Sequence, residues 1–152
     1  MKKITPFLWF DNNAEEAMNF YISIFKNSKL IDANRQGDDG LLTSARFELE
    51  GQELMVLNAG PYFKFTEAIS LFVDCKDQKE VDELWEKLSE GGQKSQCGWL
   101  KDKFGLSWQI IPKDLGELLS DSDPEKSERV MQAMLKMTKI DIEGLRQAYE
   151  GE

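Results

Sequence analysis

The sequence contains no histidine among its 152 residues. Imidazole is the side chain that titrates near neutral pH and the commonest metal ligand, so its absence excludes Ser-His-Asp and Cys-His catalysis and any His-ligated metal site. Cysteine is almost as scarce, because Cys75 and Cys97 allow at most one disulfide. A domain of this length does not need a disulfide, and we expect two free thiols in a reducing compartment.

Long hydrophobic runs are also missing. The apolar run Phe7–Phe10 stops at Asp11 and is too short for the core of a signal peptide. No segment approaches the roughly 18 consecutive apolar residues of a membrane span. We therefore expect a cytoplasmic protein without a membrane partner.

Basic residues are outnumbered, with 19 Lys and Arg against 28 Asp and Glu, for a formal net charge of −9. Such a balance repels a phosphate backbone and predicts that nucleic acid is not a partner. Hydrophobic residues make up 41% and charged residues 31% of the chain, which is an ordinary globular composition. The length fits one domain with one core.

The first sixty residues predict the order βαβββ. Residues 4–10 are β-branched and aromatic, which favours a strand, and residues 14–25 carry an apolar stripe with helical spacing. Asn12 or Asn13 is the expected cap of this helix. Three further strands are predicted at 29–35, 42–49 and 53–58, separated by glycine-containing turns.

The pattern then repeats. A strand is predicted at 69–73, a helix around Val81 and Leu88 that ends at Gly91-Gly92, and a last strand at 106–111. A shift of 64 residues carries Phe7, Trp9 and the helical stripe of the first half onto residues of the same character. The sequence therefore indicates an internal duplication. The second copy is shorter, so one of its strands is expected to be short or lost.

Residues 113–152 lie outside the duplication and predict a helical arm. Asp123-Pro124 is a typical helix start, and Asp141 is the expected cap of a last short helix. The apolar face of the first helix is expected to comprise Val130, Met131, Met134, Leu135 and Met137. This stripe must be buried either on the same domain or on a partner subunit, which makes a homodimer the natural hypothesis.

Several motifs together resemble one family. They are PFLWFD at 6–11, AEEA at 14–17 with Phe20-Tyr21, FKF at 63–65 with EAISLF at 67–72, CGWLKDKFGLSWQ at 97–109 and VMQAMLKM at 130–137. In these the chain resembles the PhnB-like family, often named demethylubiquinone methyltransferase, of the glyoxalase, bleomycin-resistance and dioxygenase (vicinal oxygen chelate) superfamily. The resemblance implies an α+β fold in which two βαβββ modules form a cup-shaped mixed sheet, and it implies dimers.

The expected domain organisation follows from this resemblance. Residues 1–112 form a glyoxalase-like domain of two modules, at about 1–60 and 66–112, and residues 113–152 form an arm of the same structural unit. Alternation in the last strand assigns Leu106, Trp108 and Ile110 to the helices and the residues between them to the cup. In the fifth strand Ser70 and Phe72 are expected to face the cup.

Metal-binding members of the superfamily place His or Glu at four positions of the cup. The resemblance carries these positions onto Pro6, Met55, Ser70 and Gln109, of which only Gln109 offers a useful oxygen. We therefore expect no metal, with a shifted site at Glu48 or Glu53 as an alternative. A Rossmann-type methyltransferase needs a glycine-rich loop between strand and helix, and the sequence has none, so no cofactor is expected.

The remaining cup is aromatic and polar, as small-molecule pockets commonly are. The candidate ligand-binding residues are Phe10, Met55, Ser70, Phe72, Gln109, Trp99, Tyr62 and Arg46, with Asn58 nearby. The first hypothesis is a metal-free dimer that binds a small, partly aromatic molecule. The alternative is an enzyme of the same fold that acts on a small metabolite, with Arg46, Glu48 or Gln109 as polar groups. A third reading is a cup that serves only as a dimerisation scaffold.

Overall fold

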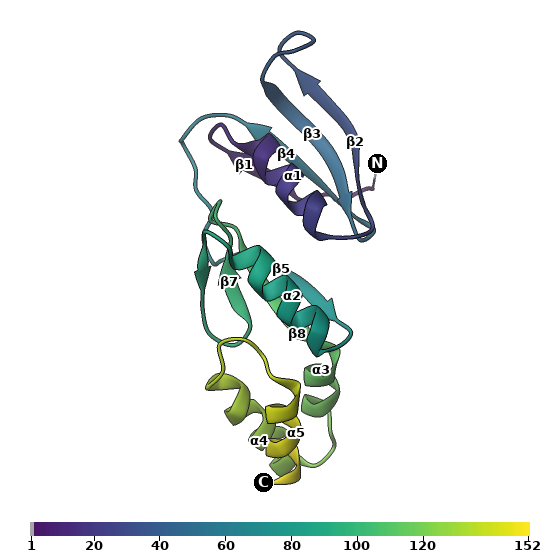
Figure 1. Ribbon diagram of the computed structural model, residues 1–152, viewed down its shortest axis with the longest axis vertical. Helices are drawn as coiled ribbons and strands as arrows, with labels where there is room; N and C mark the ends of the chain where they lie inside the picture. Colours follow the sequence, from purple (N-terminus) through teal and green to yellow (C-terminus); the bar gives the residue numbers. More distant parts are fainter. Residues whose placement is uncertain (1) are drawn as a thin grey trace. The chain divides into compact units, whose positions relative to one another are not determined.

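The computed structural model describes residues 2–152, which contain five helices and two four-stranded sheets. The chain divides into two compact units, Met1–Lys64 and Phe65–Glu152, and each unit holds one sheet (Figure 1). The α+β class expected from the sequence is confirmed. Within residues 2–152, no helix combines the length and the apolar character that crossing a membrane requires.

The first unit has the predicted βαβββ order. Its elements are β1 (Phe7–Phe10), α1 (Ala14–Ile24), β2 (Ser28–Arg35), β3 (Leu42–Leu49) and β4 (Gln52–Asn58). The strand order in the sheet is β1-β4-β3-β2, with β1 parallel to β4 and the other pairs antiparallel. A parallel pair needs a long connection, which α1 and the two following strands provide.

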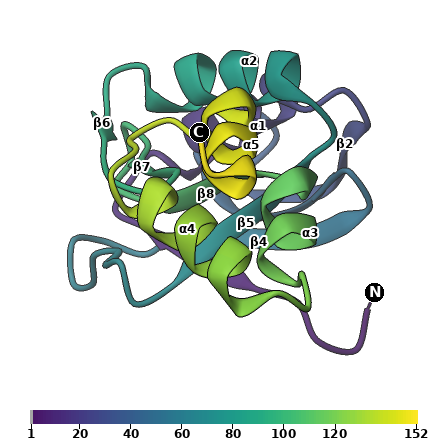
Figure 2. The same cartoon turned by 90° about the horizontal axis from the view of Figure 1, so that it is seen from below.

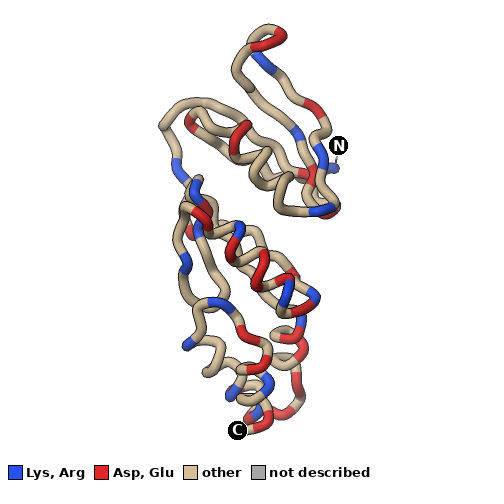
Figure 3. Tube along the Cα trace, in the orientation of Figure 1, with Lys and Arg blue, Asp and Glu red and all other residues tan. Residues whose placement is uncertain are grey.

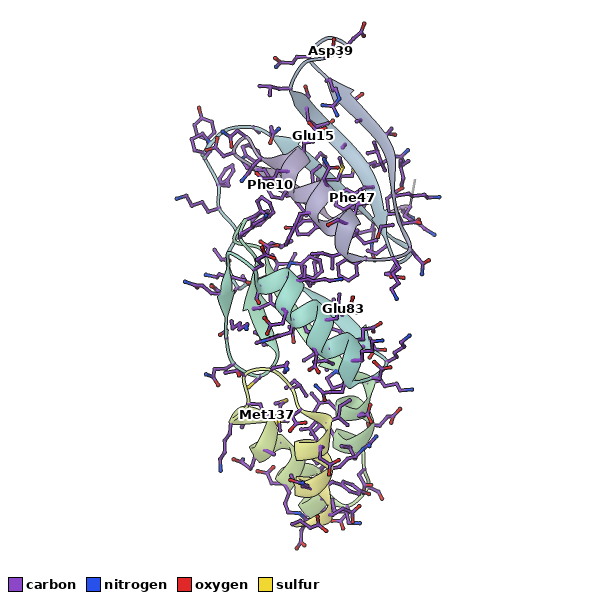
Figure 4. The ribbon with its side chains drawn as sticks, in the orientation of Figure 1. Phe10, Glu15, Asp39, Phe47, Glu83 and Met137 are labelled. Carbon is purple, nitrogen blue, oxygen red and sulfur yellow. The ribbon has the colours of Figure 1, made fainter. Side chains whose placement is uncertain are left out.

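Helix α1 covers one face of this sheet. Its buried residues are Ala14, Ala17, Met18 and Tyr21. The sheet supplies Leu8, Phe10, Ala45, Phe47, Leu54 and Val56 to the same core, each 5% exposed or less. Phe10 and Phe47 are labelled in Figure 4. These rows alternate along each strand with residues that face away from the helix.

The N-terminus of α1 is capped from a distant strand. Asn13 holds the N-cap position, but its side chain makes no cap hydrogen bond to any described residue. The Asn58 Oδ1 atom instead accepts a hydrogen bond from the Ala14 N–H at 2.9 Å, and Asn58 Nδ2 donates to the Leu42 carbonyl at 3.0 Å. The predicted N-cap position of Asn13 is thus confirmed, but the capping hydrogen bond comes from Asn58 at the end of β4 and not from the Asn12 or Asn13 side chain.

The second unit repeats the arrangement. Its elements are β5 (Ser70–Cys75), α2 (Gln78–Ser89), β6 (Gln93–Lys94), β7 (Trp99–Lys101) and β8 (Ser107–Pro112). The strand order β5-β8-β7-β6, with β5 parallel to β8, matches the first sheet. Strand β6 has only two residues, which confirms that one strand of the second copy is short. Asp77 caps α2 by accepting a hydrogen bond from the Glu80 N–H at 2.9 Å.

A buried carboxylate closes the turn between β7 and β8. Asp102 is 3% exposed and accepts three hydrogen bonds. They come from the backbone N–H groups of Phe104 at 2.9 Å and Leu106 at 3.0 Å and from Trp108 Nε1 at 2.9 Å. Gly105 in the same turn has φ of +90°, which favours glycine. The motif KDKFGLSW is thus a turn in which one side chain replaces several backbone partners.

The arm packs on its own second unit. It comprises α3 (Lys113–Leu119), which was not predicted, α4 (Pro124–Leu135) and α5 (Ile142–Glu150), grouped together in Figure 2. Their buried core consists of Ile111, Leu115, Val130, Ile140 and Leu145. Gln78 Nε2 donates to the Ile140 carbonyl at 3.0 Å, and its Oε1 accepts from the Ile142 N–H at 2.8 Å. The sequence left open whether the apolar face of the arm packs on its own domain or on a partner subunit. The structure shows packing on its own domain.

The apolar stripe of α4 is narrower than expected. Val130 is fully buried, and Met134 and Met137 pack against the core of the arm, with Met137 labelled in Figure 4. Leu135 is 51% exposed and lies off this stripe. The surface of α2 is mainly acidic, with four acidic residues between Lys79 and Lys87 (Figure 3). Exposed ion pairs such as Lys87–Glu83 at 2.8 Å add little stability.

Candidate functional site

Each sheet has one face under its helix and a second face that points away from it, which we call the open face. Strand alternation assigns every residue to one of the two faces. The open face of the first sheet includes Phe7, Trp9, Arg46, Glu48, Glu53 and Met55. The open face of the second sheet includes Ser70, Phe72, Trp99, Lys101, Ser107 and Gln109.

Four of the predicted site residues come together on the open face of the second sheet. Gln109 is the cross-strand partner of both Phe72 on β5 and Trp99 on β7. Its Nε2 donates a hydrogen bond to Ser70 Oγ at 2.9 Å, which orients the carboxamide. Phe72 is 59% exposed, so an aromatic ring lies open to contact beside an oriented polar group. The alternation expected for the last strand holds, since Trp108 and Ile110 lie on the helix side.

The open face of the first sheet carries a charged cluster. Arg46 donates from Nε and Nη2 to Asp32 Oδ2 at 3.1 and 2.9 Å, and its Nη1 lies 3.4 Å from Glu53 Oε1. Glu53 is 6% exposed and also accepts from Thr5 Oγ1 at 3.3 Å. Met55 is the cross-strand partner of Arg46. The guanidinium is thus already neutralised by two carboxylates.

Tyr62 lies in the loop after β4 and is 77% exposed. Two other residues of this loop, Gly60 and Phe63, contact Trp9. Trp9 Nε1 donates to the Gly60 carbonyl at 2.9 Å, and its ring meets Phe63 edge to face with 4.9 Å between centroids. Sequence reasoning did not place Trp9 on the open face, although pairing of β1 with β4 in the correct register would have done so.

The expected place of Phe10 in the cup is corrected by the structure. Phe10 is 3% exposed and lies under α1. The reason is a difference in register between the two copies, because Phe7 pairs with Met55 whereas Phe72 pairs with the equivalent Gln109. Strand β1 therefore corresponds to β5 with a shift of 65 residues, although the starts of the helices, Ala14 and Gln78, differ by 64.

The first unit has one residue more than the second in the turn between its first strand and its helix. Residues 11–13 separate β1 from α1, whereas only residues 76–77 separate β5 from α2. A slip of one residue moves every side chain of a strand to the opposite face. It makes Thr5, and not Pro6, the equivalent of Ser70 in the first unit.

A divalent metal does not fit the positions that the superfamily uses. With the corrected register they hold Thr5, Met55, Ser70 and Gln109, which offer two neutral hydroxyls, a thioether and a carboxamide. Such a donor set lacks the carboxylates, imidazoles or thiolates that these ions need. The alternative at Glu48 and Glu53 brings two carboxylates opposite each other on neighbouring strands, but Arg46 is bound to Glu53. Within residues 2–152, no three His, Cys, Asp or Glu side chains gather in a possible metal site.

Cys75 contributes no nucleophile to these faces. Cys75 is fully buried, and burial together with the negative charges of Glu80 and Asp74 raises the pKa of its thiol to about 12. A thiol with this pKa is protonated at neutral pH and unreactive. Cys97 is half-buried in the loop before β7 and is a free thiol.

Comparison with known proteins gives a consistent set of relatives. The profile of a family described as 3-demethylubiquinone-9 3-methyltransferase matches residues 2–111. The PhnB protein of Bacillus cereus, which carries the same name, is 38% identical over 73% of this chain and 99% of its own, with a TM-score of 0.68. Protein PA1353 from Pseudomonas aeruginosa is 22% identical over 74% of this chain and 98% of its own, with a TM-score of 0.64.

A more distant structure shows the fold alone. It is a single-residue mutant of the genomically encoded fosfomycin resistance protein FosX from Listeria monocytogenes, complexed with Mn(II) and 1S,2S-dihydroxypropylphosphonic acid. It is 16% identical over 71% of this chain and 90% of its own, with a TM-score of 0.50. A search of curated proteins finds no match.

Proposed function

From the premise that the chain belongs to the PhnB-like family, with its glyoxalase and bleomycin-resistance fold, we propose that it is a metal-independent binding protein. Its ligand is a small, flat, partly aromatic molecule held on the open face of a sheet, and the binding form is a homodimer. The methyltransferase name of the family describes a reaction whose usual cofactor loop this chain lacks. The turns between strand and helix, residues 11–13 and 76–77, contain no glycine, and neither sheet is a doubly wound parallel sheet.

The observation that carries this proposal is the exposed ring of Phe72 beside an oriented carboxamide. Burying a phenylalanine side chain stabilises a fold by roughly 1.5–3 kcal/mol. Phe72 is 59% exposed and so lacks much of this stabilisation. Its neighbours Leu71 and Val73 on β5 face the helix. A flat apolar wall with one or two orienting polar groups is how small-molecule sites are commonly lined. Gln109 and Trp99, level with Phe72 on the next two strands, complete this arrangement.

The open face of the first sheet is proposed to provide further ligand contacts. Phe7 is 51% exposed next to Met55, so this face also offers apolar contact. Arg46 is held by Asp32 and Glu53, which suits it to orient a polar group through its remaining hydrogens and not to bind a strong anion. Tyr62, on an exposed loop, is proposed to contact a ligand at the edge of this face.

Binding of 2-naphthol to protein treated with EDTA tests the proposal. We expect a rise in the melting temperature of the protein and saturable binding in calorimetry, both unchanged by EDTA. Phe72→Ala should weaken binding by about tenfold while leaving stability nearly intact, because a partly exposed contact is lost. Leu135→Ala, which removes an equally exposed apolar side chain from the arm, is the matched control. Equal affinity of wild type and Phe72→Ala would refute the site.

The homodimer has a separate measurement. Sedimentation equilibrium should give a mass of about twice the 17.5 kDa of one chain. The apolar side chains exposed elsewhere on the sheets and loops, among them Ile4, Leu41 and Ile69, are the surfaces that a second copy would cover. A monomer mass at micromolar concentration would refute the dimer.

A further inference from the structure

One hydroxyl on the open face of the second sheet has no partner. Among the described residues, two buried side-chain oxygens lack a hydrogen bond, those of Ser28 and Ser107. Ser107 is 1% exposed and belongs to β8, two residues before Gln109 and on the same face. A buried hydroxyl without a partner is unfavourable, so each such group requires an explanation. A ligand atom that completes the hydrogen bond is one explanation.

The residues around Ser107 are hydrogen-bond donors. Its cross-strand partners are Ser70 on β5 and Lys101 on β7, so the three side chains form a row across three strands. Ser70 already accepts a hydrogen bond from Gln109 Nε2, which leaves its own hydroxyl hydrogen to be donated. Lys101 has an ammonium group and no acceptor. The row therefore offers three donors to an acceptor oxygen, whereas only the two serine hydroxyls can accept from a ligand donor.

The charge of Lys101 indicates the charge of the ligand group that this row would bind. Lys101 forms an ion pair with the carboxylate of Glu67, which is 60% exposed and precedes β5. An exposed ion pair of this kind is weak and exchanges readily. One lysine that pairs with one exposed carboxylate matches a ligand with a single negative charge better than a ligand with two. Glu67 itself shows that a carboxylate reaches the ammonium of Lys101.

We infer that Ser70, Ser107 and Lys101 bind the carboxylate of a planar aromatic acid, whose ring lies against Phe72 and Trp99. This inference rests on the proposed function and names the class of ligand. Entry of the carboxylate displaces Glu67 from Lys101 and brings an acceptor to the unpaired Ser107 hydroxyl. The Lys101 side chain is 36% exposed and long enough to admit the carboxylate, while Gln109 keeps its hydrogen bond to Ser70. No covalent step is involved.

The test is calorimetry of the full chain with 2-naphthoate and with 2-naphthamide. The two probes share the ring, but only 2-naphthoate carries an ionised carboxylate at pH 7. We expect 2-naphthoate to bind about tenfold more tightly, since charge-assisted hydrogen bonds are the stronger ones. Equal affinity for both probes and for 2-naphthol would refute the carboxylate subsite and leave the proposed function intact. Absence of binding for all three would refute both.

Two substitutions with opposite expected effects sharpen the test. Ser107→Ala should weaken binding of 2-naphthoate by about tenfold without lowering the melting temperature, because no hydrogen bond of the free protein is lost. Glu67→Gln should strengthen it by roughly threefold, because the competing carboxylate is removed. Ser89→Ala, at the other buried serine of this unit, and Glu83→Gln, in an ion pair with Lys87 that is exposed to a similar degree, are the controls.

The outcomes separate cleanly. If Ser107→Ala lowers the melting temperature and leaves the affinity unchanged, the hydroxyl is held by an internal water and the inference is wrong. It is equally wrong if Glu83→Gln strengthens binding as much as Glu67→Gln, because the effect would then be one of net charge. Weaker binding in Ser107→Ala together with tighter binding in Glu67→Gln alone supports it.

Discussion

Replacing Asp102 by alanine should be among the most destabilising single changes in the second unit. The carboxylate is 3% exposed and accepts hydrogen bonds from two backbone N–H groups and from the indole of Trp108. Alanine removes the acceptor of the buried hydrogen bonds from the Leu106 N–H and the indole N–H of Trp108, and of the part-buried one from the Phe104 N–H. Each unpaired buried group costs about 1–3 kcal/mol. We therefore expect a loss of about 3–5 kcal/mol in the free energy of unfolding.

Urea unfolding followed by tryptophan fluorescence measures this loss. Asp102→Asn is the informative companion, because a carboxamide oxygen keeps part of the acceptor role and should cost roughly half as much. Asp74→Ala, at an exposed position on β5, is the control and should change stability by less than about 0.5 kcal/mol. The reasoning is wrong if Asp102→Ala costs less than about 1 kcal/mol, since the three hydrogen bonds would then contribute little.

Three further predictions concern other parts of the chain. Trp108→Ala should cost roughly 3–5 kcal/mol in urea unfolding, whereas Gln109→Ala should leave stability nearly unchanged; the reverse would mean that the register of β8 is off by one residue. Ellman's reagent at pH 8 should modify one thiol per native chain and two per unfolded chain, because burial raises the pKa of Cys75 to about 12. The pKa of Tyr149 is raised because its hydroxyl donates to Asp121 at 2.7 Å, so its contribution to stability is present below its unfolded pKa of about 10 and is lost as the pH rises further. Tyr149→Phe should flatten the fall in stability between about pH 9 and pH 11, and an unaltered profile would contradict the linkage.

Local patterns predicted the elements of the fold well, because strand and helix periodicity depend on neighbouring residues. The bounds expected for β3, 42–49, agree with Leu42–Leu49, and the duplication is visible in both sheets. Helix α3 was missed because it follows β8 without a break. Its only local signal is the spacing of Leu115, Leu118 and Leu119.

The faces of the candidate-site residues were predicted correctly on β5 and β8 but not on β1. On β5 and β8 the expected faces hold for Ser70, Phe72 and Gln109. On β1 a single extra residue in the turn before α1 placed Phe10 under the helix, and no local pattern reveals such an insertion when both strand faces are apolar. Contacts set by tertiary structure, such as the cap of α1 by Asn58, were likewise invisible to local reasoning.

The arm is attached to the second sheet in part through side chains of the sheet and of α2. The family profile ends at residue 111, and the first helix of the arm begins at Lys113. The carboxamide of Gln78 holds two backbone groups of the arm, as a neighbouring peptide group would, and Ile111 enters its apolar core. Neither contact requires the sheet to be rebuilt. The arm therefore enlarges the second unit through side-chain contacts, without adding a strand to its sheet.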